Sequence, residues 1–319
     1  MSKKLKILSL FSGAGGLDIG FKKAGFKTVW ANDFDKNITP SFKNYFPKVP
    51  FDDRSIELIS NEEIPNDDIC GVIGGPPCQS WSNAGSRRGI NDPRGQLFNA
   101  YLRVIKHVKP KFFLVENVPG IIHSRNKDSF NNIIRDLGKE HYIVRPMLLK
   151  ASDYGVAQDR KRVFVVGYHK KLGKEFDVPE PLKARKVLRD VIGDLENIEK
   201  RSKEILNHEF SSSSFSPIYM SRNRVRNWDE TSYTILASER NIPLHPGAPK
   251  MIKIKTDEWR FDENDIDAYR RLSVRECARI QGFPDDYEFK YDRITHGYKM
   301  VGNAVPINLA KVLAQKIMK

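Results

Sequence analysis

Residues 6–16 read KILSLFSGAGG, an apolar run that ends in a turn rich in serine and glycine. The run predicts a short buried strand. Its glycines allow the backbone to approach a ligand closely, and the helical spacing of residues 17–24 places a helix N-terminus beside the turn. A second strand is expected over residues 27–31, ending near Asp33. This succession of strand, glycine turn, helix and strand is typical of a parallel sheet that binds a ligand at the carboxyl ends of its strands.

Strand and helix patterns continue to alternate further along the chain. Apolar strands are predicted over residues 69–73, 111–115 and 162–168, and an amphipathic helix is predicted over residues 97–108. The alternation predicts an α/β fold, Rossmann-like, with a mostly parallel, doubly wound sheet. Glu116 follows the second of these strands, so we expect it at the same edge of the sheet as the glycine turn.

The pattern changes after about residue 170. Little strand–helix alternation remains between residues 170 and 261, where a serine run at 211–214 and an arginine-rich segment at 222–226 stand instead. We expect a second, smaller domain here, mostly irregular or β-rich. A short amphipathic helix over residues 309–318 is expected to close the chain.

The composition limits the classes of function. Lys and Arg number 54 against 40 Asp and Glu, a formal charge of +14, which favours a polyanionic partner. The three cysteines, Cys70, Cys78 and Cys277, make no disulfide framework and match no zinc pattern, so we expect no metal and a reducing, cytoplasmic setting. The lysines before residue 7 resemble a signal peptide, but the apolar run breaks at Ser12. No run approaches the ~20 apolar residues of a membrane span.

Three segments carry candidate chemistry. Residues 74–80 (GGPPCQS) present Cys78 on a turn made rigid by two prolines, where a cysteine can act as a nucleophile, although a cysteine taken alone is more often a small buried residue. Glu116 is a candidate proton donor or a solvated strand-end residue. Arg160 and Arg162 share one side of a strand, where they would bind a phosphate or substrate oxygen or form a solvated basic face.

Asp18 stands where a dinucleotide-binding fingerprint has its third glycine, which disfavours a dehydrogenase. Six motifs follow one another along the chain, namely FSGAGG (11–16), PPCQ (76–79), ENV (116–118), QDRKR (158–162), RLSVRECARIQGFP (271–284) and GNAV (302–305). They stand in the order seen in the DNA cytosine-C5 methyltransferases, which the chain resembles over nearly its whole length.

The resemblance implies that the chain transfers a methyl group from S-adenosyl-L-methionine to C5 of a cytosine flipped out of double-stranded DNA, leaving S-adenosyl-L-homocysteine. In this mechanism Cys78 adds to C6, Glu116 holds N3, and Arg162 holds O2 of the base. Arg160 is predicted to join this catalytic set.

Cofactor residues are also implied by the resemblance. Asp33 stands where the family has an acidic ribose ligand, often glutamate, and Ser273 stands where threonine is usual. The adenine contact is assigned to Asp53, although the adjacent Asp52 remains an alternative. The whole predicted cofactor set is Phe11, Ala14, Gly15, Gly16, Leu17, Asp33, Phe34, Asp53, Pro77, Leu97, Asn303 and Val305.

The resemblance further predicts a catalytic domain over residues 1–188 and 299–319 and a small target-recognition domain over residues 189–298. The segments 220–228 and 244–251 resemble the HaeIII-type subgroup, whose target is GGCC, although residues 237–242 depart from it. Predicted DNA contacts are Gln79, Ser82, Arg94, Arg222, Arg224, Arg226 and Arg240.

Expected partners are duplex DNA and a restriction endonuclease that shares the target site, and the chain is expected to act as a monomer away from membranes. Two alternatives stay open, a tRNA cytosine-C5 methyltransferase and a catalytically silent relative that only binds nucleic acid.

Overall fold

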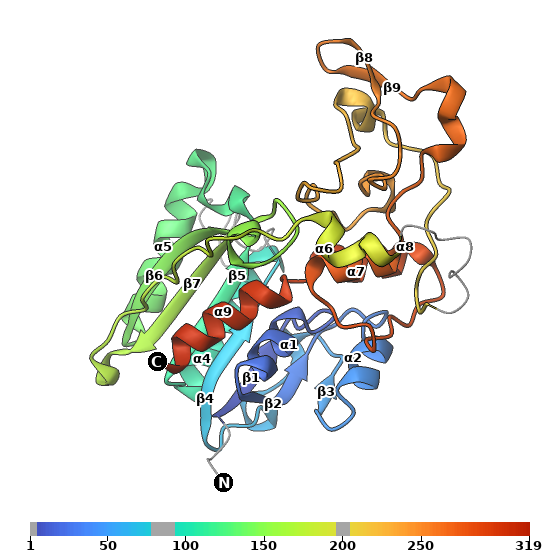
Figure 1. Ribbon diagram of the computed structural model, residues 1–319. Coiled ribbons are helices and arrows are strands. Elements are labelled where there is room, and N and C mark those ends of the chain that lie inside the picture. Colours follow the sequence, from blue (N-terminus) through green and yellow to red (C-terminus); the bar gives the residue numbers. More distant parts are fainter. Residues whose placement is uncertain (1–4, 78–92, 196–204) are drawn as a thin grey trace. The chain divides into compact units, whose positions relative to one another are not determined.

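The computed structural model describes residues 5–77, 93–195 and 205–319, which form two compact units (Figure 1). Unit 1 comprises Met1–Lys150, Lys161–Glu180 and Ala310–Lys319, and unit 2 comprises Ala151–Arg160 and Pro181–Leu309. The predicted boundaries at residues 188 and 298 stay a prediction.

Unit 1 is built on a sheet in the order β3-β2-β1-β4-β5-β7-β6. Strands β1 to β5 pair in parallel, and β7 runs antiparallel to both β5 and β6. The predicted α/β fold with a mostly parallel sheet is therefore confirmed. The strands are β1 (Leu5–Leu10), β2 (Phe26–Asn32), β3 (Phe51–Asp52), β4 (Ile69–Gly74), β5 (Phe112–Asn117), β6 (Tyr142–Lys150) and β7 (Lys161–His169).

Both faces of this sheet are covered by helices, because side chains along each strand alternate between two apolar layers. Leu8 and Leu10 of β1 join the core cluster formed with α4 and α5. The opposite face carries α1 and α9 (Figure 1), and the Tyr168 hydroxyl donates to the Ile317 carbonyl at 3.2 Å. The helices are α1 (Gly16–Lys23), α2 (Thr39–Tyr45), α4 (Pro93–Val108), α5 (Lys127–Lys139) and α9 (Ile307–Met318). In the described ranges, no helix has the length and apolar character to cross a membrane.

Asp18 in α1 is a fully buried carboxyl group. It accepts hydrogen bonds from the Ser9 and Thr28 hydroxyls, both at 2.9 Å. Burial nevertheless raises the pKa of Asp18 to about 6. The folded chain therefore binds a proton at the Asp18 carboxyl more tightly than the unfolded chain does. As the pH rises from about 4 through about 6, this carboxyl ionises and the folded state loses stability.

We expect Asp18→Asn to raise the free energy of unfolding at pH 7.5 by about 1–3 kcal/mol, because the amide keeps the shape without a buried charge. The gain should shrink at pH 5, where the wild-type carboxyl is largely protonated. Urea unfolding at both pH values measures it, with Asp136→Asn, a half-exposed surface carboxylate, as the control. A gain that is equal at both pH values would contradict the assigned cause.

Unit 2 is irregular in its described part and is not β-rich as one alternative predicted. Its regular elements there are the pair β8 (Ile252–Lys255) and β9 (Glu258–Arg260), with α6 (Leu188–Ile192), α7 (Val274–Gln281), α8 (Ile294–Asn303) and short 3-10 helices. Side chains satisfy backbone groups in place of a strand ladder. The Tyr219 hydroxyl donates to the Ile242 carbonyl, and the Tyr233 hydroxyl donates to the Asn223 carbonyl.

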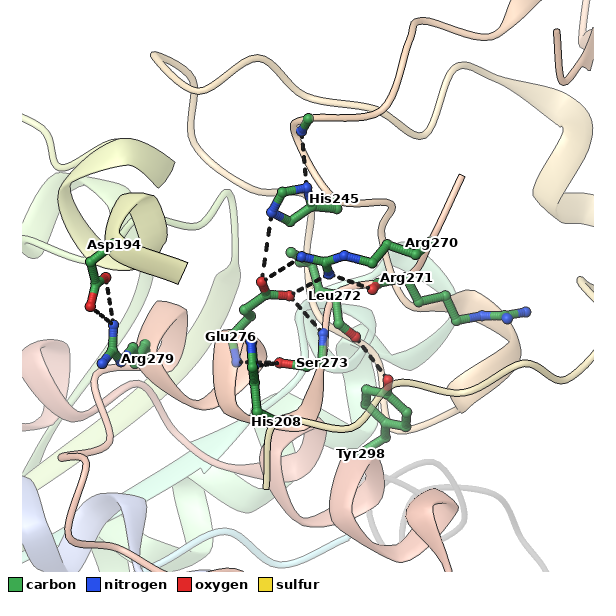
Figure 2. A network of polar contacts seen from close by, with 11 residues as sticks. Asp194, His208, His245, Arg270, Arg271, Leu272, Ser273, Glu276, Arg279 and Tyr298 are labelled. Carbon is green, nitrogen blue, oxygen red and sulfur yellow. Dashed lines mark hydrogen bonds and ion pairs between the residues drawn. The ribbon is translucent and has the colours of Figure 1, made fainter. Parts of the chain in front are cut away.

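A buried carboxylate at the start of α7 organises the polar interior of unit 2 (Figure 2). Arg270 donates to both oxygens of Glu276 at 2.9 Å, and the Ser273 backbone N–H donates to the same carboxylate at 2.8 Å. His245 lies 3.6 Å from Glu276. Burial lowers the pKa of His245 to about 4, so it is neutral near pH 7. The side chain of Ser273 caps α7.

Candidate active site

Glu116 and Arg162 form an ion pair at the C-terminal end of β5 in the sheet of unit 1. Antiparallel pairing of β5 with β7 places Glu116 opposite Phe164, which brings Arg162 beside it. The Arg162 Nε lies 2.8 Å from the Glu116 Oε1, and each side chain is only 11% exposed. Burial lowers the pKa of Arg162, and the Glu116 carboxylate opposes this shift. The pair is therefore a charged hydrogen-bond site that is largely withdrawn from water.

The turn that leads to Cys78 packs against this pair. A Cβ placed on Gly75 would lie 3.0 Å from the Glu116 Oε2, so the carboxylate rests directly on the backbone of the turn. The Asn117 amide donates to the Pro76 carbonyl at 2.8 Å. Cys78 itself lies outside the described residues. Pro77 is the residue directly before Cys78 in the sequence, so the described part of this turn ends one residue before the predicted nucleophile.

The glycine turn after β1 leaves an opening at the carboxyl end of the sheet. Phe11 and Gly13 have φ angles of 53° and 54°, and Gly15 has a φ of 76°. A left-handed backbone is strained at phenylalanine and tends to occur at functional sites. A Cβ on Gly13 would meet nothing within 4 Å, and the Gly13 N–H donates to the Asp33 carboxylate at 2.9 Å.

The other predicted cofactor residues of unit 1 differ in burial. Phe11 and Leu97 pack against the same core cluster. Phe34 is 54% exposed. The Asp52 carboxylate is bound by Arg54 in a two-pronged ion pair, whereas Asp53 is exposed. The residues of the turn and of the start of α1 are buried, namely Ala14, Gly15, Gly16 and Leu17. Pro77 is exposed.

Asn303 and Val305 belong to unit 2, where Asn303 is exposed and Val305 is buried. The same unit holds Arg160, which is fully buried and donates to the carbonyls of Ile235, Gly302 and Ala304 at 2.9, 2.7 and 3.2 Å. Arg160 thus differs in setting from Arg162, and its membership in the catalytic set stays a prediction.

The four predicted DNA-reading arginines of unit 2 fall into two groups. Arg224 donates to the carbonyls of Tyr219 and Ile218, both at 2.7 Å. Arg226 pairs with Glu230 at 3.0 Å. Arg222 and Arg240 are exposed, although Arg240 donates to the Phe215 carbonyl at 3.4 Å and the Arg222 guanidinium lies 4.9 Å from the centre of the Tyr233 ring.

Gln79 and Ser82 lie outside the described residues, as does the side chain of Arg94.

Cys70 and Cys277, the two cysteines in the described part of the chain, are both buried. Burial raises the pKa of Cys70 to about 11, and it raises the pKa of Cys277 well above its ordinary value. Neither is therefore a thiolate near neutral pH.

The sequence interpretation missed Asn117, which ties β5 to the turn before Cys78. Its place directly after the candidate acid at a strand end was the available signal.

Comparison with known proteins places this geometry in a family. Residues 5–319 match the model of the C-5 cytosine-specific DNA methylases. The Type II methyltransferase M.FnuDI of Fusobacterium nucleatum is 50% identical over 98% of this chain and 94% of its own length. M.MthTI of Methanothermobacter thermautotrophicus, also a Type II methyltransferase, is 51% identical over 99% and 97%.

A solved structure has the same fold at low identity. The Entamoeba histolytica methyltransferase EhMeth superposes with a TM-score of 0.74 at 19% identity, over 99% of this chain and 98% of that one. From the family match and the relatives, the chain belongs to the C-5 cytosine-specific DNA methylases, enzymes that act on DNA and take their methyl group from S-adenosylmethionine.

Proposed function

We propose that this enzyme methylates C5 of a cytosine flipped out of duplex DNA at GGCC, as the modification enzyme of a Type II restriction–modification system. The observation that carries the catalytic part is the Glu116–Arg162 pair, held against the turn that leads into Cys78. The relatives named Type II methyltransferases support the biological setting. A matching endonuclease and action as a monomer are part of the proposal.

The chain's residues make an unreactive ring carbon nucleophilic. The Cys78 thiolate adds to C6, and Glu116 holds the proton at N3 that neutralises the charge building on the ring. Arg162 binds O2 and shares this charge, a role suited to its withdrawal from water. Once C5 carries the transferred methyl group, the C5 proton leaves to solvent and β-elimination breaks the S–C6 bond, which releases the Cys78 thiolate. The cytosine must leave the base stack for these groups to reach it.

The opening at the glycine turn fits an adenosine-containing methyl donor. Gly13 faces open space beside Asp33, whose two carboxylate oxygens accept from the Gly13 and Asp35 N–H groups, and we assign the ribose hydroxyls to this carboxylate. We assign the adenine to the exposed Asp53, because Asp52 is bound by the charged side chain of Arg54. S-Adenosylmethionine supplies an electrophilic methyl group when it is bound. We assign Phe11, Leu97 and Pro77 to its apolar surroundings, and the family resemblance adds Asn303 and Val305 to the proposed cofactor residues.

Replacing Glu116 by Gln should lower the rate of methyl transfer by about 10²–10⁴-fold, because an amide accepts from Arg162 but cannot hold a proton at N3. Single-turnover transfer of a tritiated methyl group measures this rate. The exposed Glu63→Gln serves as the control. Transfer at the wild-type rate by Glu116→Gln would remove Glu116 from the mechanism.

Target recognition is assigned to unit 2, and general affinity for DNA to unit 1. Almost all of the net charge of +14 lies in unit 1, which favours contacts with phosphates there. The predicted reading arginines all lie in unit 2. Arg222 and Arg240 are exposed, which suits them to guanine, whereas Arg224 and Arg226 are less exposed and donate shorter hydrogen bonds within unit 2.

Substitution of Arg222 or Arg240 by Ala should cost about 1–3 kcal/mol of discrimination between the target and singly altered sites. Arg224→Ala should instead lower the stability, because two backbone carbonyls lose their donor. Turnover on a panel of duplexes, with thermal unfolding of each variant, separates the two results. Equal losses on every duplex for Arg222→Ala and Arg240→Ala would indicate phosphate contacts instead.

Bisulfite sequencing of plasmid DNA from cells that express the chain tests the whole proposal. Protected cytosines confined to GGCC would support the reaction, the atom and the target together. Protection at another sequence would keep the reaction and overturn GGCC. If the folded chain binds S-adenosylmethionine but protects no cytosine, the tRNA-methylating alternative or a silent relative replaces the proposal.

A further inference from the structure

Three fully buried polar side chains of unit 2 join two turns that are far apart in the sequence. Gln158, Arg160 and Gln281 are each 0% exposed. One turn follows Ile235 and carries the exposed Leu236 and Arg240. The other, residues 301–305, is the C-terminal end of α8 with the residues that follow it, and it carries the exposed Asn303. We call these three side chains the polar clamp.

The clamp holds the first turn through both backbone polar groups of one residue, Ile235. Gln158 accepts a hydrogen bond from the Ile235 N–H at 3.1 Å, and Arg160 donates to the Ile235 carbonyl at 2.9 Å. The Thr234 hydroxyl donates to the Asp159 carbonyl at 2.6 Å. Residues 158–160 therefore fix the chain immediately before Leu236.

The same side chains hold the second turn. Arg160 donates to the carbonyls of Gly302 and Ala304. Gln281 receives a hydrogen bond from Gln158 at 3.1 Å and donates to the Val301 carbonyl at 3.0 Å. The clamp thus connects the two turns through a continuous set of buried hydrogen bonds, which are stronger in a low-dielectric interior.

The two turns also touch directly. A Cβ built on Gly302 would lie 2.4 Å from the Leu236 carbonyl oxygen and 2.6 Å from the Ala237 nitrogen. Only glycine allows the two backbones to approach so closely. A displacement of one turn must therefore move the other.

We propose that Arg160, with Gln158 and Gln281, is a positioning residue that sets the spacing between a target-reading turn at residues 236–240 and a cofactor turn at residues 302–305. This inference rests on the proposed function, because it takes the roles of Arg240 and Asn303 from there. Target discrimination and cofactor affinity are then coupled, since one set of buried bonds fixes both turns. Arg160 acts without touching the base.

The test compares Arg160→Met, Arg160→Lys and Gly302→Ala in the full-length enzyme. Gly302→Ala removes no hydrogen bond and forces only the two turns apart. Arg103→Met is the matched control for Arg160→Met, because Arg103 also donates to two backbone carbonyls, those of Ile56 and Ile59, but lies in unit 1. Gly138→Ala is the matched control for Gly302→Ala, because a Cβ at Gly138 would meet nothing within 4 Å.

Each variant is assayed below its unfolding midpoint for S-adenosylhomocysteine affinity by calorimetry and for kcat and KM on the duplex that the wild type methylates. Singly altered duplexes measure discrimination. Arg160→Met and Gly302→Ala should each weaken cofactor affinity and discrimination by about tenfold or more. Arg160→Lys should restore part of both, because it keeps a donor. Arg103→Met should lower only the unfolding midpoint.

Two outcomes would overturn the inference. In one, Arg160→Met and Gly302→Ala change affinity and discrimination no more than Arg103→Met does, which leaves only a structural role. In the other, Arg160→Met lowers kcat alone while Gly302→Ala behaves as wild type, which makes Arg160 a catalytic residue. If the wild type methylates no duplex, the proposed function fails, and the calorimetry still decides whether the clamp controls the cofactor turn.

Discussion

Cys78→Ser is expected to abolish methyl transfer, with a loss on the order of 10⁴-fold or more, because a serine hydroxyl is not ionised near neutral pH and adds poorly to a pyrimidine ring. The proposed addition to C6 is the step that makes C5 reactive, so no later step can compensate. Single-turnover transfer to target duplex DNA measures the loss, and plasmid DNA from cells that express the variant should lack protected cytosines.

Binding should survive this substitution, because the serine leaves the Glu116–Arg162 pair and the Asn117 hydrogen bond to Pro76 intact. Duplex affinity and the fluorescence of 2-aminopurine at the target position should therefore stay close to wild type. Cys70→Ser and Cys277→Ser serve as matched controls, since both thiols are buried and protonated, and they should keep catalysis in proportion to the folded fraction. Wild-type turnover by Cys78→Ser would refute the covalent mechanism.

Glu276→Ala should lower the free energy of unfolding by about 3–5 kcal/mol, a shift of about 10 °C in Tm. The carboxylate is fully buried, and Arg270 binds it through two hydrogen bonds while its own side chain is only 15% exposed. Removing Glu276 leaves that guanidinium charge without its carboxylate and removes the acceptor for the Ser273 N–H. Thermal and urea unfolding measure the change.

The control is Glu263→Ala, whose ion pair with Arg260 is exposed and should contribute about 0.5 kcal/mol or less. The double variant Arg270→Met with Glu276→Leu should be less damaging than Glu276→Ala, because it leaves no isolated buried charge. A loss below about 1 kcal/mol for Glu276→Ala would contradict the assigned role of the carboxylate.

Much of unit 1 could be predicted from local patterns. The apolar runs before Ser12 and Glu116 correspond to β1 and β5, because strands buried on both faces are continuous in hydrophobicity. The order of motifs along the chain also identified the family, since Cys78, Glu116 and Arg162 carry chemistry that few other patterns combine. Helix α4 begins at Pro93, before the predicted position 97, because proline suits the first turn of a helix.

Unit 2 was less predictable, because it has few repeating elements in its described part. Arg224 and Arg226 looked equivalent to Arg222 and Arg240 in the sequence, since a guanidinium has the same charge wherever it lies. Only the fold shows that the first two are partly buried and bind carbonyls and a carboxylate of their own unit at short distances, whereas Arg222 and Arg240 are exposed.

The sequence by itself determined the family, the sheet and the predicted identity of the reacting groups, because these depend on residue type and on spacing within short segments. The tertiary structure alone decided what the polar residues do to one another. Arg160 stands two positions before Arg162, yet it binds the Gly302 carbonyl 142 residues away, whereas Arg162 pairs with Glu116. A buried donor must find an acceptor wherever the fold provides one, and no local pattern encodes that partner.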